Sequence, residues 1–194
     1  MASLVDGIDW PIHTERLVLR PATVADVDAT WRFRHLESVS RWLTRAPQTL
    51  AEYRSQFIEP ESLAKSLVME LEGEVVGDLM VAIGDAWAQA EVSDDARGVE
   101  AGLGWALHPD TGGRGLATEA VREVLRLCFD DLALRRVTAE CFAANESSWR
   151  LMERVGMRRE CHNVRDSLHR AGEWLDGYGY ALLADEWRSA ASIT

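Results

Sequence analysis

Three glycines stand within four positions immediately before a helical pattern, in the stretch HPDTGGRGLATEA of residues 108–120. Because Gly112, Gly113 and Gly115 lack side chains, an anion can approach the backbone there and successive N–H groups can converge on it. The first turn of the helix adds unpaired N–H groups and the positive end of the helix dipole. We therefore expect this loop to hold a diphosphate.

The glycine loop departs from two common nucleotide-binding patterns. A dinucleotide-binding loop carries a third glycine, but Thr118 stands at that position here. A Walker loop requires Gly-Lys-Ser/Thr, whereas Lys65 is the only lysine of the chain. Taken alone, the loop is equally compatible with an anion site and with a structural turn.

The elements around the loop are predicted from their periodicity. Apolar residues recur at helical spacing from Leu116 to Leu132, and the preceding residues 99–109 alternate as a strand. One face of that strand is bulky, and the other is almost bare apart from Glu100. A bare strand face indicates that a helix or a ligand approaches the backbone closely.

The remaining pattern predicts an α+β domain that covers residues 1–194. A strand at 15–20, helices at 23–36 and 50–57, and a hairpin at 66–83 that turns around Glu72 and Gly73 come first. They are followed by a polar loop at 84–98, a strand at 135–142, a helix at 147–155, and an antiparallel pair at 157–164 and 174–183.

Composition excludes several classes of function. The net charge of −11 disfavours nucleic acid and anionic membranes as partners. It is compatible with a cationic substrate and equally with acidity that only keeps the protein soluble. Three widely spaced cysteines indicate free thiols, with a catalytic cysteine as the alternative, and argue against a disulfide framework and a metal site. The N-terminus lacks a signal-peptide pattern and no apolar run spans a bilayer, so we expect a cytoplasmic protein.

Four motifs together resemble a known family. GWALHPDTGGRGLATEA and the later NESSWRLMERVGM resemble the GNAT superfamily of N-acetyltransferases, and more narrowly its RimJ/RimL-like branch. HTERLVLRPATVADVDA and GEWLDGYGYALLADEW, near the two ends of the chain, fit the same branch. The resemblance implies a mixed, mostly antiparallel sheet of six to seven strands flanked by about four helices. It also implies acetyl-CoA as the acyl donor and no metal.

The resemblance places the cofactor on two parts of the chain. The family pattern Gln/Arg-x-x-Gly-x-Gly/Ala falls on residues 112–117, with Gly112 where the family usually has Gln or Arg. The backbone of residues 105–107 would pair with the pantetheine arm, between this strand and that of residues 135–142. The cofactor-binding residues so implied are Trp105, Ala106, Leu107, Gly112, Gly113, Arg114, Gly115, Leu116, Ala117, Thr118, Asn145 and Ser148.

Transfer of an acetyl group to an amine needs an acid for the departing thiolate and an oxyanion donor. Ser148 is our candidate for the acid, with Tyr180 or Tyr178 as the rival, and a backbone N–H near Leu107 would stabilise the oxyanion. Asn145 would hold the pantetheine, or would cap a short helix together with Ser147.

The general base is less well determined by the sequence. Relatives often carry Glu where Gly102 stands, and Glu100 lies one pleat earlier on the same face. Asp166 and His108 are the other candidates, and some family members rely on water chains alone.

Three functions remain open at this point. The first is N-acetylation of a primary amine, either a protein N-terminus or a small cationic amine, by an enzyme that belongs to a family in which homodimers are common. The second is a non-catalytic acyl-CoA-binding module, which the substitutions at Gly112 and Gly102 keep in play. The third is transfer of a longer acyl group, for which Gly102 and Gly104 leave room.

Overall fold

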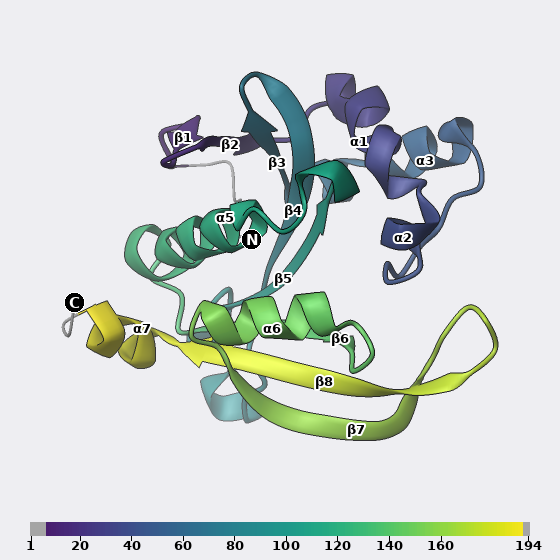
Figure 1. The fold of residues 1–194 in the computed structure, drawn as a ribbon. Coiled ribbons are helices and arrows are strands. Elements are labelled where there is room, and N and C mark those ends of the chain that lie inside the picture. The colour runs from purple at the N-terminus through teal and green to yellow at the C-terminus, as the bar shows by residue number, and fades with distance from the viewer. Residues whose placement is uncertain (1–6, 192–194) are drawn as a thin grey trace. The chain divides into compact units, whose positions relative to one another are not determined.

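The computed structural model describes residues 7–191, which form an α+β arrangement around a mixed sheet (Figure 1). The strand order is β1-β2-β3-β4-β5-β6-β8-β7. Strands β5 and β6 are parallel, and the pairs β1–β2, β2–β3, β3–β4, β6–β8 and β7–β8 are antiparallel. The strands are β1 (Ile12–His13), β2 (Leu17–Pro21), β3 (Ser66–Leu71), β4 (Glu74–Gly84), β5 (Glu100–Leu107), β6 (Arg136–Phe142), β7 (Arg158–Leu168) and β8 (Trp174–Leu183).

The sheet therefore has eight strands among the described residues, and the expectation of six to seven was too low. The additional strand is β1, which pairs with β2 through Ile12 and His13. A strand of two residues is too short to show alternation, so the sequence pattern could not reveal it.

The helices are more numerous than the four expected. Residues 7–191 contain α1 (Val27–Arg34), α2 (Glu37–Ser40), α3 (Leu50–Phe57), α4 (Pro60–Leu63), α5 (Leu116–Arg126), α6 (Glu146–Arg154) and α7 (Ala184–Ala191). Two of the additional helices, α2 and α4, are single turns, and α7 follows β8 without a loop. Short 3-10 segments precede α1 and α5, and one at Ala90–Ala96 lies in the predicted polar loop.

The predicted hairpin of β3 and β4 is confirmed. Leu71 pairs with Glu74, and the two residues between them, Glu72 and Gly73, have φ angles of 53° and 83°. Two consecutive residues with positive φ are typical of the type I′ turn, whose twist matches that of the flanking strands.

The chain divides into two compact units, which are described separately. The unit of residues 7–81 and 104–121 holds β1 to β3, α1 to α4, most of β4 and the glycine loop. The unit of residues 82–103 and 122–191 holds β6 to β8, α6 and α7. The assignment of residues 1–194 to one domain stays a prediction.

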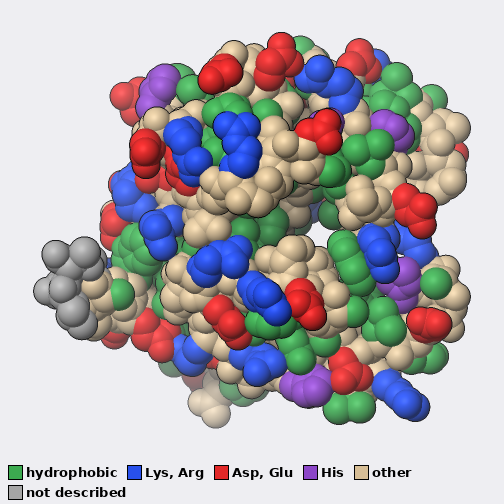
Figure 2. All heavy atoms as spheres, viewed as in Figure 1, with side chains coloured by type: hydrophobic (Ala, Val, Ile, Leu, Met, Phe, Trp, Pro, Cys, Tyr) green, Lys and Arg blue, Asp and Glu red, His purple; other side chains and the backbone are tan. Residues whose placement is uncertain are grey.

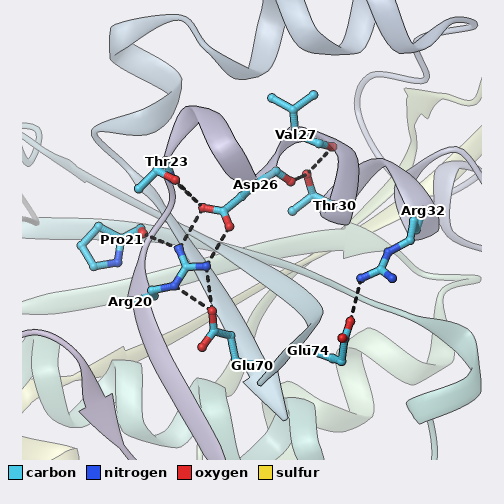
Figure 3. Close-up of polar contacts among 9 residues, drawn as sticks. All are labelled: Arg20, Pro21, Thr23, Asp26, Val27, Thr30, Arg32, Glu70 and Glu74. Atoms are coloured by element: carbon cyan, nitrogen blue, oxygen red, sulfur yellow. Dashed lines mark hydrogen bonds and ion pairs between the residues drawn. The ribbon is translucent and has the colours of Figure 1, made fainter. Parts of the chain in front are cut away.

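In the first unit, β2 and β3 bury their apolar side chains together with Phe33 of α1. An ion-pair cluster lies at the edge of this core (Figure 3). The Arg20 guanidinium donates to both carboxylate oxygens of Asp26, at 2.7 and 2.8 Å, and to Glu70 on β3 at 2.8 Å. Asp26 also accepts the backbone N–H of Thr23 at 2.7 Å, so the cluster fixes the start of α1 against the sheet.

In the second unit, β8 lies between β6 and β7, and α6 packs on these strands. Buried apolar residues of α6 and β6 meet there, among them Leu151, Met152, Val137 and Ala139. The β7–β8 ribbon extends well beyond α6 (Figure 1).

Charged side chains of both signs are intermingled on the face of the molecule shown in Figure 2. No helix within residues 7–191 is long and apolar enough to cross a membrane.

Candidate functional site

The glycine loop joins β5 to α5 through a short 3-10 turn, Pro109–Thr111. Gly113 and Gly115 have φ angles of +73° and +80°, which residues with side chains rarely adopt. The backbone N–H of Glu119 donates to the Gly115 carbonyl at 3.0 Å. This is the first hydrogen bond of α5, and the N–H groups that precede it at the helix start have no intrahelical acceptor. The loop thus presents backbone donors at a helix N-terminus, and its use as an anion site stays a prediction.

Gly112 has a local explanation. Its N–H donates to the Pro109 carbonyl at 2.9 Å, and a Cβ at position 112 would lie only 3.0 Å from the same oxygen. A Gln or Arg at this position would press against the turn, so glycine suits the tight connection that this chain uses. By contrast, a Cβ at Gly113 would meet nothing within 4 Å, which leaves the backbone there open to an approaching group.

Three side chains that no sequence motif singled out, those of Thr14, Arg16 and Glu119, form a hydrogen-bonded clamp on the glycine loop. The Arg16 guanidinium donates to the Arg114 carbonyl at 2.9 Å and to Glu119, in the first turn of α5, at 2.7 Å. The Glu119 carboxylate also accepts the backbone N–H of Arg16 at 2.8 Å and the hydroxyl of Thr14 at 2.6 Å. Burial alone would raise the pKa of Glu119, but these hydrogen bonds outweigh it and hold the pKa below its ordinary value.

The end of β5 lies close to β4, its neighbour in the sheet. The expected approach of a helix or a ligand to the bare face of β5 stays a prediction. A Cβ at Gly77 of β4 would come within 2.7 Å of the Ala106 carbonyl oxygen and 2.9 Å of the Leu107 side chain. The backbone N–H of His108 donates to the Val76 carbonyl at 2.7 Å. Ala106 is buried, whereas Trp105 and Leu107 are partly exposed.

Asn145 and Ser148 lie at the start of α6. Asn145 is the N-cap residue, but its side chain caps nothing within the described chain, and Ser147 donates its hydroxyl to the Asn145 side-chain oxygen at 2.9 Å. The nearby Ser148 hydroxyl lowers the pKa of the Cys141 thiol on β6. Burial, the larger effect, raises the pKa of Cys141 to about 11, so this residue remains a thiol at neutral pH. Ser148 itself is partly exposed.

The two tyrosines of β8 differ in environment. Tyr180 is 2% exposed and donates its hydroxyl to Glu153 of α6 at 2.9 Å. Burial, aided by this hydrogen bond, raises the pKa of Tyr180 to about 12. Tyr178 is partly exposed and carries the Arg159 guanidinium 4.5 Å above its ring. These contacts make Tyr180 a well-packed core residue, and its catalytic role stays a prediction.

Each candidate for the general base has its own partners. The Glu100 carboxylate lies 3.4 Å from the Arg135 guanidinium and 4.0 Å from that of Arg136. The ring of His108 accepts the backbone N–H of Asp110 at 3.2 Å, and Asp166 accepts the Ser167 hydroxyl at 2.7 Å. None of the three is marked out from the others by its surroundings.

Known proteins place the chain in a family. Residues 16–158 match the acetyltransferase (GNAT) domain. The uncharacterized N-acetyltransferase YnaD of Bacillus subtilis (strain 168) is 36% identical over 85 residues, which cover 44% of this chain and 49% of YnaD. The matched region therefore spans about half of that relative's length.

Solved structures share the fold over most of the chain. A GNAT-family acetyltransferase from Bacillus anthracis is 28% identical, with a TM-score of 0.75 over 90% of this chain and 99% of the other. RimL, described as a ribosomal L7/L12 alpha-N-protein acetyltransferase in complex with coenzyme A, is 16% identical, with a TM-score of 0.71 over 89% and 97%. A member of the predicted RimJ/RimL-like branch is thus among the structural neighbours, and the chain belongs to the GNAT family of acetyltransferases.

Proposed function

We propose that this protein transfers an acetyl group from acetyl-CoA to a primary amine in the cytoplasm. The observation that carries the proposal is the glycine loop, in which Gly113 and Gly115 adopt positive φ immediately before α5. Acetyl-CoA supplies an activated thioester, whose carbonyl carbon an unprotonated amine attacks, with release of the CoA thiol. RimL, which shares the fold, was solved with coenzyme A.

The residues of the loop fit a diphosphate. Its N–H donors stand at the positive end of a helix of 11 residues, and the space above Gly113 is open. We propose that the backbone of residues 113–118 binds the diphosphate and that the backbone of residues 105–107 pairs with the pantetheine arm. Asn145 would bind the same arm.

Ser148 is the proton donor in this proposal. The residue is partly exposed at the start of α6, and it lies near the thiol of Cys141 on β6. Tyr180 is the weaker candidate, because its hydroxyl is buried and committed to Glu153. No single residue is assigned as the base, and water can carry the proton from the attacking amine to solvent.

The acceptor class is an amine that is cationic at neutral pH. RimL is named for acetylation of a protein N-terminus, which supports a similar acceptor here. The net charge of −11 favours encounter with any cationic amine, including a small one.

The proposal is tested by turnover. The protein is mixed with acetyl-CoA and a panel of peptides with free N-termini and of small polyamines, and release of the CoA thiol is followed with a thiol reagent. We expect amine-dependent thiol release, with the acetyl group found on the acceptor by mass spectrometry. Tight binding of acetyl-CoA without turnover of any amine would instead favour the binding-module alternative. Faster release of the CoA thiol from butyryl-CoA than from acetyl-CoA would favour transfer of a longer acyl group.

A further inference from the structure

One hydrogen bond in the Arg16 clamp is made to the backbone of the glycine loop itself. Arg16 donates to the carbonyl oxygen of Arg114 at 2.9 Å. The peptide bond between Arg114 and Gly115 is planar and trans, so its C=O and N–H groups point in opposite directions. A guanidinium that holds the carbonyl on its own side therefore turns the Gly115 N–H to the other side.

This peptide flips by rotation about ψ of Arg114 and φ of Gly115. Gly115 lacks the side chain that normally restricts its φ, so the peptide needs such a restraint. A flipped peptide would replace the N–H of Gly115 by a carbonyl oxygen, which repels a phosphate instead of binding it. The difference between a donor and an acceptor at this one position would decide how well the loop holds an anion.

We propose that Arg16 and Glu119 are positioning residues that lock the Arg114–Gly115 peptide with its N–H toward the CoA diphosphate. The inference rests on the proposed function, since it concerns the same loop. Glu119 fixes the guanidinium through its Nε at 2.7 Å, and Thr14 fixes Glu119 at 2.6 Å.

The clamp acts through orientation more than through charge. The positive charge of Arg16 lies 2.7 Å from the Glu119 carboxylate, so the pair presents little net charge to a bound phosphate. The geometry also requires a branched donor, because one side chain must reach a carboxylate and a carbonyl at once. Lysine keeps the charge of arginine but lacks this planar fork.

The chain supplies a matched control at the other end of α5. Arg126 binds Glu123 at 2.7 Å and Asp131 at 2.9 Å, and its side chain is 36% exposed against 39% for Arg16. Arg126 contacts no loop carbonyl in the recorded hydrogen bonds of the described chain. Its loss should therefore cost similar stability without an effect on cofactor binding.

The experiment measures the dissociation constant of CoA for the full chain and for Arg16→Gln, Arg16→Lys and Arg126→Gln. Loss of one donor to a charged group corresponds to a change of about tenfold to a hundredfold in affinity. We expect both Arg16 variants to weaken CoA binding by that factor and to raise KM for acetyl-CoA with kcat little changed. The Arg126→Gln variant should bind CoA as the unaltered protein does. Thermal unfolding of all four proteins shows that each is folded.

The outcomes separate the clamp from the proposed function. If the unaltered protein binds CoA and Arg16→Gln binds it equally well, the proposed positioning role of Arg16 is wrong and the proposed function stands. If Arg16→Lys retains full affinity while Arg16→Gln loses it, charge is the operative property and the orientation argument fails. If the unaltered protein does not bind CoA, both proposals fall. Should Arg16→Gln not fold, the Glu119→Gln variant gives the same test, with the same expected loss of affinity.

Discussion

Arg16 and Arg20 stand four residues apart on the first strand hairpin, and each guanidinium binds a carboxylate at 2.7 Å. The remaining contacts of Arg20 go to Glu70 on β3 and to the Pro21 carbonyl, all within the core edge drawn in Figure 3. The remaining contact of Arg16 goes to the carbonyl of Arg114 in the glycine loop. Both clusters are thus built on an arginine–carboxylate ion pair, but one joins elements at the edge of the core and the other contacts the glycine loop.

A polar network affects either stability or binding, depending on which groups it joins. Asp26 is 5% exposed and joins a strand to a helix, so its loss leaves Arg20 partly unpaired at the core edge and should reduce stability. The Arg16 cluster is more exposed and contacts the glycine loop, so its loss should reduce the affinity for CoA more than the stability.

The largest effect is expected on stability at Asp26. Asp26→Ala removes the partner of Arg20 and the acceptor of the Thr23 N–H, so we expect the free energy of unfolding to fall by about 3 kcal/mol. Urea denaturation measures it. Asp28→Ala is the control, because its exposed ion pair with Arg54 should contribute less than about 1 kcal/mol. A loss of CoA affinity in folded Asp26→Ala would break the division between the two clusters.

A comparable effect on rate is expected at Ser148. Ser148→Ala removes the proposed proton donor, and we expect kcat to fall by about a hundredfold while KM for acetyl-CoA changes little. Ser147→Ala is the matched control, since that neighbouring hydroxyl binds only the Asn145 side chain in the recorded contacts. Steady-state kinetics measure kcat of both variants, and equal values would show that Ser148 is not the proton donor.

A smaller effect is expected at two glycines of like geometry. Gly113 and Gly73 have φ angles of +73° and +83°, and a Cβ at either position would meet nothing within 4 Å. Alanine at each should therefore cost about 1 kcal/mol of stability. Only Gly113→Ala should also weaken CoA binding, by about tenfold, because its methyl group would occupy the open side of the loop. Equal CoA affinities, measured by titration calorimetry, would contradict an anion site at Gly113.

The smallest effect is the pH dependence of stability that Asp26 contributes. Burial would raise the pKa of Asp26, but hydrogen bonds from Arg20 and Thr23 outweigh it, and the folded-state pKa lies below its ordinary 3.8. The stabilisation is therefore complete above pH 3.8 and is lost as the pH falls through the folded-state value. The difference in unfolding free energy between the unaltered protein and Asp26→Ala should narrow in acid. A constant difference between pH 7 and pH 2.5 would refute this.

The local sequence pattern was sufficient to predict an element whose conformation is determined by its own residues. The turn at Glu72 and Gly73 and the helical periodicity after Leu116 were both confirmed, because turn chemistry and amphipathic spacing act over a few residues. The two-residue β1 and the single-turn helices lack enough residues to show a period.

Contacts between distant residues were the part that the sequence could not supply. Arg16 and Glu119 are separated by 103 positions, and each on its own resembles an ordinary surface charge. Tyr180 and Ser148 were both plausible acids from residue type, and only the packing of α6 showed that Tyr180 is buried against Glu153. Similarly, the carbonyl of Pro109 explains Gly112, which the family pattern left unexplained.

The most direct test of the account is calorimetric titration of the full chain with acetyl-CoA, beside pantetheine without the diphosphate and beside NAD. We expect 1:1 binding of acetyl-CoA and much weaker binding of the other two ligands, since in our proposal the glycine loop holds the diphosphate and residues 105–107 hold the pantetheine arm. Absence of acetyl-CoA binding, or equally tight binding of pantetheine alone, would contradict the claim that this loop is a diphosphate site.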